Sequence, residues 1–325
     1  MKEKNLAIVL TLTLAVACIP LKASASNQDP VLAKISSRIK ELPGSKANVE
    51  ASAIDWIVSP KVPRGYKEAL QRQHQKLTNQ FPTLYKWQGT ALAIIGDPFT
   101  WSLPADSLSE NCLGRYEAIT SAWKELPHLE QRLLAGTSYC DGHLFVVFRP
   151  DPSNPTPDPD LMAQELGGEI QENARYNNPK ISALEHGVLV MPAWFLQGGQ
   201  SALAFQLYVG EKRTLSGAPS KVVLSPECLT VNLEKLEPTT SGKYWNCLYS
   251  KGFASVQLMI ALYGWDATTK WFSGYSSDTD YKEAFKRAYG DSLSSFNKLA
   301  DSYWKSLVNK QYTPKDVIAR LKKVS

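Results

Sequence analysis

A short acidic stretch in the middle of the chain has the residue types and the spacing for proton-transfer or metal chemistry. Glu165, Glu169 and Glu172 recur at helical spacing, and Gln164 and Gly168 lie one turn apart beside them. Carboxylates on a helix can bind a hard cation or act as a general acid or base. A solvated acidic face is the ordinary interpretation of Glu169 and Glu172, which leaves Glu165 as the candidate for chemistry.

The residues around Glu165 are similar to a zinc-peptidase helix that has lost both of its histidines. In H-E-x-x-H, two imidazoles one turn apart bind zinc while the glutamate polarises the attacking water. Gln164 and Gly168 stand at the two histidine positions. Downstream, the stretch MPAWFLQGG is similar to the P-x-W-[LF]-x-E-G segment whose glutamate is the third zinc ligand in gluzincin peptidases. Gln197 stands at that ligand position.

Further motifs in the same order extend the resemblance to secreted gluzincins of the peptidase-MA-like kind. A Y-x-x-G element at Tyr249–Gly252 precedes an apolar run that ends in Tyr263–Gly264, and A-F and Y-G pairs follow. The resemblance covers roughly half of the chain, from 159 to 307. It implies an α+β, zincin-like fold in which a small mixed N-terminal sheet lobe precedes a mostly helical C-terminal lobe. It also implies that positions 164, 168 and 197 converge on one pocket, with Tyr249 beside the cleft.

The substituted positions predict a pocket without zinc, and therefore no cofactor. A catalytic zinc needs three nitrogen, sulfur or oxygen ligands from the protein, whereas these positions offer two amides and a bare backbone. His186, between the two motif segments, is either a substitute ligand or a loop histidine bonded to backbone. The two glutamines can both donate and accept hydrogen bonds, so they are expected to bridge the helices where zinc would lie. Neutral drift after loss of activity is the alternative.

Other hydrolytic chemistries have weaker support in the sequence. The chain contains no G-x-S-x-G nucleophile elbow, and its mature cysteines are expected to form disulfides. The remaining histidines, His74, His128 and His143, are interpreted as a helix-surface, a turn and a strand-edge residue. Without zinc to lower the pKa of a bound water molecule, Glu165 would have to activate ordinary water, which is much harder.

The first 25 residues have the pattern of an export signal. A lysine-containing start, an apolar run over 6–17 and an A-x-A site predict cleavage after Ala25. The alternative is a lipoprotein signal, because the residues before Cys18 fit a loose lipobox that would leave this cysteine acylated. No later segment approaches the roughly 20 apolar residues that span a bilayer. The expected location is secreted or extracytoplasmic, or lipid-anchored at Cys18.

Charge and cysteine content narrow the function further. The formal net charge is +5, and removal of the signal takes away three lysines and one glutamate, which leaves +3. This charge is too small to indicate a nucleic-acid partner. Four cysteines remain in the mature chain, and an even number in an exported protein predicts two disulfides. Three pairings are possible, and the sequential one, Cys112–Cys140 with Cys228–Cys247, is expected because each pair lies within one segment.

Hydrophobic periodicity and turn residues predict the elements that would position these groups. Buried strands are expected at 91–96 and 143–148, a polar stretch before about residue 50, and a loop over 210–242. Helices are expected at 66–77, 116–134 with a break at Pro127, 158–175, 194–208, 252–263, 293–307 and 314–323. Gly198 and Gly199 inside a helix indicate that another backbone comes close.

A proline-rich stretch over 149–160 marks the expected boundary between the lobes. The predicted domains are a signal peptide at 1–25, a mixed N-terminal lobe at 26–158 and a helical lobe at 159–325. The predicted function is that of a secreted gluzincin-like pseudo-peptidase that binds a peptide or a cell-envelope component or has a structural role. The alternatives are an active hydrolase, either zinc-dependent through substitute ligands or metal-free through Glu165, and a lipid-anchored scaffold.

Overall fold

A computed structural model gives the structure of the protein over most of its length. It describes residues 29–41, 54–80, 91–104, 106–125, 135–141, 143–150, 156–157, 165, 167–168, 171, 191–212, 226–237, 244–275, 280–309 and 311–324. The strands are β1 Ile54–Val58, β2 Ala91–Ile95, β3 Ala135–Cys140 and β4 His143–Phe148. The first helices are α1 Pro30–Glu41, α2 Tyr66–Gln80 and α3 Glu110–Glu125. They are followed by α6 Ala193–Lys212, the short 3-10 helices η1 Pro226–Thr230 and η2 Leu233–Leu236, α7 Trp245–Tyr263, α8 Ala267–Ser273, α9 Tyr281–Tyr289, α10 Leu293–Val308 and α11 Lys315–Lys323.

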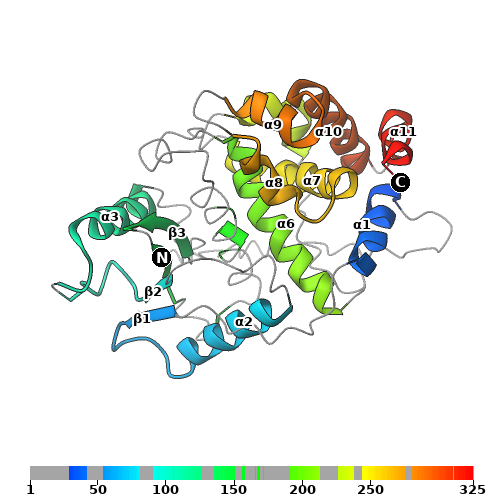
Figure 1. Ribbon diagram of the computed structural model, residues 1–325. Coiled ribbons are helices and arrows are strands. Elements are labelled where there is room, and N and C mark those ends of the chain that lie inside the picture. The colour runs from blue at the N-terminus through cyan, green and yellow to red at the C-terminus, as the bar shows by residue number, and fades with distance from the viewer. Residues whose placement is uncertain are drawn as a thin grey trace, which may run out of the picture.

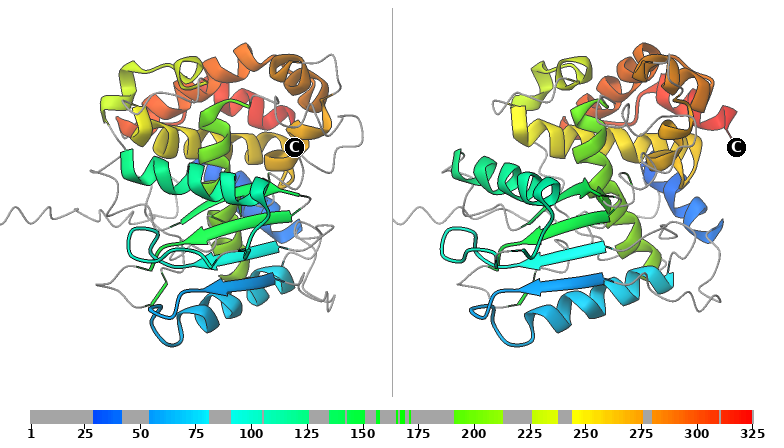
Figure 2. Two further views of the ribbon diagram at one scale, coloured as in Figure 1. Left: turned by 90° about the vertical axis from the view of Figure 1, so that its left-hand side faces the viewer. Right: turned by 60° about the vertical axis from the view of Figure 1, so that its left-hand side comes forward.

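The strands form one mixed sheet in the order β1-β2-β4-β3. β1, β2 and β4 run parallel, and β3 pairs antiparallel with β4 at the edge. Figures 1 and 2 show α3 over one face of this sheet and α2 and α6 on the other. Parallel strands need helical crossovers, and the helices on both faces explain why the sequence of β2 is a continuous apolar run.

Successive residues of each inner strand enter opposite cores. Ile94 pairs with Val147 across β2 and β4, and both pack with Tyr116 of α3. Ala93 and Ile95 point to the other face and are also buried. The predicted strands at 91–96 and 143–148 are therefore confirmed, with β2 ending at residue 95.

The larger hydrophobic core lies among the C-terminal helices and is dominated by aromatic rings. Trp271 packs on Phe195 and Phe285 with ring centroids 4.5 Å and 4.7 Å apart. Phe296 stacks on Trp194 at the start of α6. These rings are fully buried, so they contribute large apolar areas and fix the angles at which α6, α8, α9 and α10 meet. The chain is thus mixed and rich in helix, as predicted at this coarse level.

The N-terminal helix α1 joins this helical core, although the sequence indicated only a polar stretch there. Val31 and Ile35, one turn apart, are buried against the C-terminal helices. Arg38 donates from Nε to the carbonyl oxygen of Ala261 in α7 at 3.2 Å. A helix with only a narrow apolar stripe gives a weak sequence signal, and its partners lie more than 200 residues away.

Several predicted boundaries were wrong. Helix α3 begins at Glu110 rather than 116, because Ser109 Oγ accepts a hydrogen bond from the backbone N–H of Cys112. Helix α7 begins at Trp245 rather than 252. The edge strand β3, with the sequence AGTSYC, lacks apolar alternation and was missed, as was β1. His74 was interpreted as a surface residue but is buried in α2, because it lies one turn after buried Leu70 on the core face.

Both predicted disulfides are present in the structure. Cys112–Cys140 ties the start of α3 to the end of β3, and Cys228–Cys247 ties η1 to the first turn of α7. Within the described ranges, no helix has the length and apolar character that crossing a membrane requires. The domain boundaries and the zincin-like character of the fold stay predictions.

Candidate functional site

The centre of the candidate site is the contact between α6 and α7, where two glycines let the helices touch backbone to backbone. A Cβ atom added to Gly198 would lie 2.2 Å from the carbonyl carbon of Gly252, and one added to Gly252 would lie 2.5 Å from the carbonyl oxygen of Trp194. Any side chain at either position would therefore force the helices apart. The close approach that the glycines indicated is confirmed.

The segment that carries Glu165 docks on the same helix α6. Residues 165, 167, 168 and 171 are helical, and the Gln171 side chain is buried. Gln171 Nε2 donates to the carbonyl oxygen of Phe195 at 3.4 Å. The same amide covers Gly199, where an added Cβ would lie 2.1 Å from Nε2. Gln171 was not identified from the sequence, although it lies one turn after Gly168.

Glu165 lies close enough to Tyr249 of α7 to influence it electrostatically. Burial raises the pKa of Glu165 to about 8, so the carboxyl group keeps its proton at pH 7. Burial also raises the pKa of Tyr249, and the negative charge of an ionised Glu165 raises it further. At neutral pH the carboxyl group of Glu165 and the phenol of Tyr249 are therefore both uncharged. Both groups can donate a hydrogen bond.

The structure describes two of the other predicted site residues, Gly168 and Gln197, and leaves two outside the described ranges. Gly168 is buried on the same helical segment as Glu165. Gln197 lies in α6 and is partly exposed. It is two residues from both Phe195 and Gly199, and hence about half a turn away from the helix face that Gln171 contacts. Gln164 and His186 lie outside the described residues, so the glutamine bridge and the substitute-ligand role of His186 stay predictions.

The donor set at these positions does not fit zinc. Gly168 has no side chain, and the nearby amide of Gln171 is engaged with Phe195. Amides are neutral and bind zinc weakly compared with imidazole, thiolate or carboxylate. Where side chains are described, no three His, Cys, Asp or Glu residues gather closely enough for a metal site.

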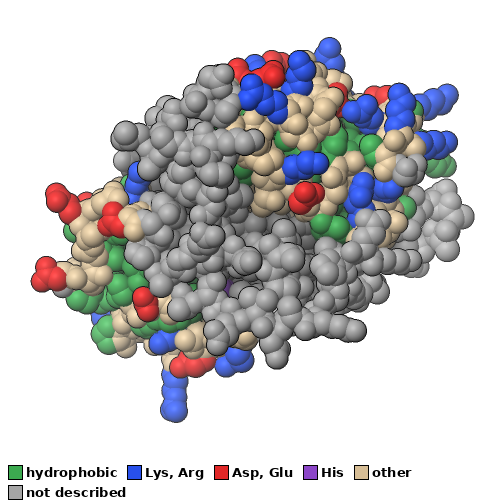
Figure 3. Space-filling view, viewed as in Figure 1, with side chains coloured by type: hydrophobic (Ala, Val, Ile, Leu, Met, Phe, Trp, Pro, Cys, Tyr) green, Lys and Arg blue, Asp and Glu red, His purple; other side chains and the backbone are tan. Residues whose placement is uncertain are grey.

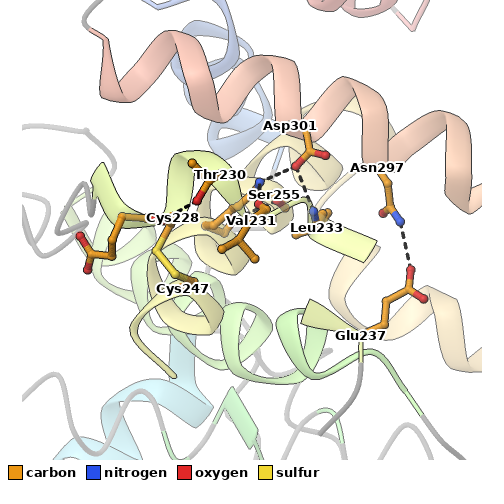
Figure 4. A network of polar contacts seen from close by, with 11 residues as sticks. Cys228, Thr230, Val231, Leu233, Glu237, Cys247, Ser255, Asn297 and Asp301 are labelled. Carbon is orange, nitrogen blue, oxygen red and sulfur yellow. Dashed lines mark hydrogen bonds and ion pairs between the residues drawn. A yellow bond between two sulfur atoms is a disulfide. The ribbon is translucent and has the colours of Figure 1, made fainter. Parts of the chain in front are cut away.

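A polar network fixes the start of α7 and with it Tyr249. Lys251 is fully buried, and its Nζ lies 2.5 Å from Oδ1 of Asp301 in α10. It also donates to the carbonyl oxygen of Val231. The same Asp301 oxygen accepts from the backbone N–H of Leu233 at 3.0 Å (Figure 4). Residues 226–237, which we term the clip, are thus bound to α7 and α10 at several points beyond the disulfide.

The far end of the clip holds the start of α6. The Glu237 carboxylate accepts from the Tyr281 hydroxyl at 2.7 Å and from Nδ2 of Asn297 at 3.0 Å. Its backbone carbonyl accepts from the N–H of Ala193, the first residue of α6, at 3.1 Å. The clip therefore fixes both helices of the candidate site, α6 at its start and α7 in its first turns.

The polar anchors of the clip were not found by sequence reasoning. Lys251 is a lysine in an apolar helix, and Glu237 lies in a stretch interpreted as loop. Burial lowers the pKa of Lys251, and the Asp301 carboxylate opposes this shift. One feature of the sequence could have indicated the buried role of Lys251. It is a charged residue inside the Y-x-x-G element, where it interrupts an apolar run.

The protonation of Glu165 gives a prediction for stability against pH. The folded-state pKa of about 8 lies above the ordinary value of 4.5, so the folded protein binds one more proton than the unfolded chain between these values. Stability is therefore expected to fall as pH rises through this window, by up to about 1.4 kcal/mol per pH unit. Glu165→Gln removes this slope. Urea unfolding of both proteins at pH 5.5, 6.5 and 7.5 measures the difference.

Other titrating groups cancel when the unfolding free energies of the wild type and Glu165→Gln are compared at each pH. His74 has its pKa lowered by burial to about 4, so it reduces stability as pH falls below 6.5. It does so equally in the wild type and in Glu165→Gln, and the difference between the two isolates position 165. Parallel curves over the three pH values would show that Glu165 is ionised in the folded protein.

Comparison of the chain with protein-family models, with curated proteins and with solved structures finds no match.

Proposed function

We propose that the protein is an exported, gluzincin-like pseudo-peptidase whose cleft binds a peptide without metal and without cleaving it. The observation that carries the proposal is the burial of Glu165 on a helical segment whose next turn bears Gly168, close enough to Tyr249 of α7 for its charge to raise the pKa of the phenol. The general-base position of the resemblance is retained, and a metal-ligand position is bare. The two disulfides are compatible with an extracytoplasmic location.

The uncharged state of the pair favours a neutral ligand. A protonated carboxyl group and a phenol both donate hydrogen bonds, and peptide carbonyl oxygens are their natural acceptors. An anionic ligand would gain no ion pair from these two groups. Lys251, the nearest lysine in sequence, is already paired with Asp301. A peptide backbone, which is rich in carbonyl oxygens and carries no charge, fits this donor pair best.

Metal analysis and peptide binding together test the proposal. Protein purified without chelator is expected to contain far less than one zinc per chain, and to leave fluorescein-labelled casein intact with or without added zinc. A mixture of neutral hexapeptides, captured on immobilised protein and identified by mass spectrometry, is expected to be enriched. Glu165→Leu and Tyr249→Phe should each weaken that capture, by about tenfold for one lost hydrogen bond.

The matched control is Tyr312→Phe, which removes an exposed phenol far along the chain. It should leave capture unchanged. Stoichiometric zinc together with chelator-sensitive casein hydrolysis would reject the metal-free proposal. Equal capture by the wild type and both site variants would place the binding surface elsewhere.

The raised pKa of Glu165 supports a second candidate, a metal-free hydrolase. A buried carboxyl group with a shifted pKa beside a phenol is a common acid/base arrangement. Glu165 would protonate a leaving group in this case, and hydrolysis would fall as pH rises past about 8. Casein hydrolysis that persists in EDTA and disappears in Glu165→Gln distinguishes this candidate from both the pseudo-peptidase and a zinc enzyme.

A further inference from the structure

The chain enters the described part of the molecule directly beside the C-terminal helix. The Asp29 carboxylate accepts hydrogen bonds from the Tyr303 hydroxyl, at 3.4 Å, and from the Thr313 side chain. Thr313 immediately precedes Pro314, the N-cap residue of α11. Helix α1, which follows Asp29, packs against α11 as well as α7. The first described residue, Asp29, therefore lies beside the start of α11.

Helix α11 has an apolar side and a basic side. Val317 and Leu321 are buried against the rest of the protein. Lys315, Lys322 and Lys323 are exposed and fall within an arc of about 100° on the opposite side, at 3.6 residues per turn. The packing of α11 thus presents these three lysines together to solvent.

Tyr312 extends this basic side with an aromatic ring. It is 84% exposed, whereas Phe99 and Leu113, the other exposed large apolar side chains among the described residues, are 38% and 39% exposed. The acidic residue of α11, Asp316, is also exposed, and its Oδ1 accepts from the N–H of Val317. Figure 3 shows lysine and arginine side chains gathered over the part of the surface where α11 lies.

We propose that Tyr312 and the lysines of α11 form a docking surface for an anionic lipid bilayer. A lysine near an anionic membrane gains electrostatic attraction that falls off within a Debye length. Tyrosine favours the headgroup region, because its ring is apolar and its hydroxyl group is polar. The surface therefore combines the two side-chain types that bind peripheral proteins to charged bilayers.

The position of Asp29 favours a bilayer over a soluble polyanion. The sequence predicts an export signal that ends either at Ala25 or in an acylated Cys18. From Cys18 to Asp29 the chain spans 11 residues and reaches at most about 40 Å. An acyl chain at Cys18 and the α11 surface would therefore reach the same bilayer.

Vesicle flotation of the unlipidated chain 26–325 tests the surface itself. At low salt the protein is expected to float with vesicles of phosphatidylcholine and phosphatidylglycerol, but not with phosphatidylcholine alone, and 0.5 M salt should release it. Each lysine near an anionic surface is expected to raise the vesicle partition coefficient roughly fivefold. The variant K315Q/K322Q/K323Q should therefore lower it about 100-fold. The matched control, K282Q/K286Q/R287Q on α9, loses the same charge and should stay within about threefold of the parent.

The role of Tyr312 separates a bilayer from a soluble polyanion. Tyr312→Ser should weaken flotation while leaving binding to inorganic polyphosphate unchanged. All these substitutions are at exposed positions, and circular dichroism verifies that each variant is folded. The proposal is overturned by a parent protein that does not float with anionic vesicles, by equal loss in the α9 control, or by binding to polyphosphate alone. None of these outcomes bears on the Glu165 site.

Discussion

Replacing Gly198 with alanine is expected to lower the free energy of unfolding by about 3 kcal/mol or more, because its Cβ would overlap the backbone of Gly252. The clash is with the carbonyl carbon of the neighbouring helix, so no side-chain rotation can relieve it. Gly252→Ala should have a similar effect through the carbonyl oxygen of Trp194. Both changes force α6 and α7 apart and separate the elements that carry the site. Urea unfolding followed by circular dichroism measures the loss.

The chain offers a matched control in Gly114 of α3. A Cβ added there has no heavy atom within 4 Å, so Gly114→Ala should stabilise the protein by about 0.5–1 kcal/mol through helix propensity alone. Equal, small effects of Gly198→Ala and Gly114→Ala would contradict the close packing of α6 on α7. Both changes replace glycine with alanine inside a helix, so they have the same effect on the unfolded chain. The expected difference in sign therefore reports on packing in the folded protein.

Lys251→Met is expected to destabilise the protein by about 3–5 kcal/mol. The change leaves the Asp301 carboxylate without its cation and the carbonyl oxygen of Val231 without its side-chain donor. Asp301 also accepts from Leu233, so the loss should extend to the clip. Because the clip fixes the start of α7, the variant should also weaken any function that depends on Tyr249. Chemical unfolding and peptide capture measure the two effects separately.

An exposed ion pair provides the comparison for Lys251. Arg287 lies 3.7 Å from Glu283 on the surface of α9, and Arg287→Met should change stability by no more than about 0.5 kcal/mol. The double variant Lys251→Met with Asp301→Leu should recover part of the loss, because no unpaired charge remains. A cost below about 1 kcal/mol for Lys251→Met alone would mean that water solvates the Asp301 carboxylate once the lysine is removed.

The clip holds both helices of the candidate site, α6 and α7, at their starts. In the structure, Cys228–Cys247 and the Lys251 ion pair fix the first turns of α7, while Glu237 fixes the start of α6. The disulfide lies at one end of the clip, and the polar anchors continue to the other. The helices that meet at Gly198 are thus fixed by contacts outside their interface as well as by the close packing within it.

Local patterns in the sequence determined the elements whose signal is strong and short in range. The apolar runs of β2 and β4 predicted buried strands, because a strand covered on both faces must be apolar at every position. Glycine at 198 predicted a close backbone contact, since nothing else explains its cost inside a helix. The two disulfide pairs followed from an even cysteine count and from their short separations. Helix α1 and strand β3 were missed, because each is stabilised by partners that its own sequence does not indicate.

The tertiary structure alone decided the chemistry of the candidate site. The sequence pointed to Glu165, but its proton is held by burial, which depends on elements packed around it from distant parts of the chain. Lys251 was not identified from the sequence because its partners among the described residues, Val231 and Asp301, lie 20 and 50 residues away. Periodicity reports which side of an element is apolar, whereas the charge state of a buried group is set by its neighbours in space. For this protein, the sequence pointed to Glu165 and Tyr249, whereas Gln171, Lys251 and the protonation of Glu165 were recognised only in the tertiary structure.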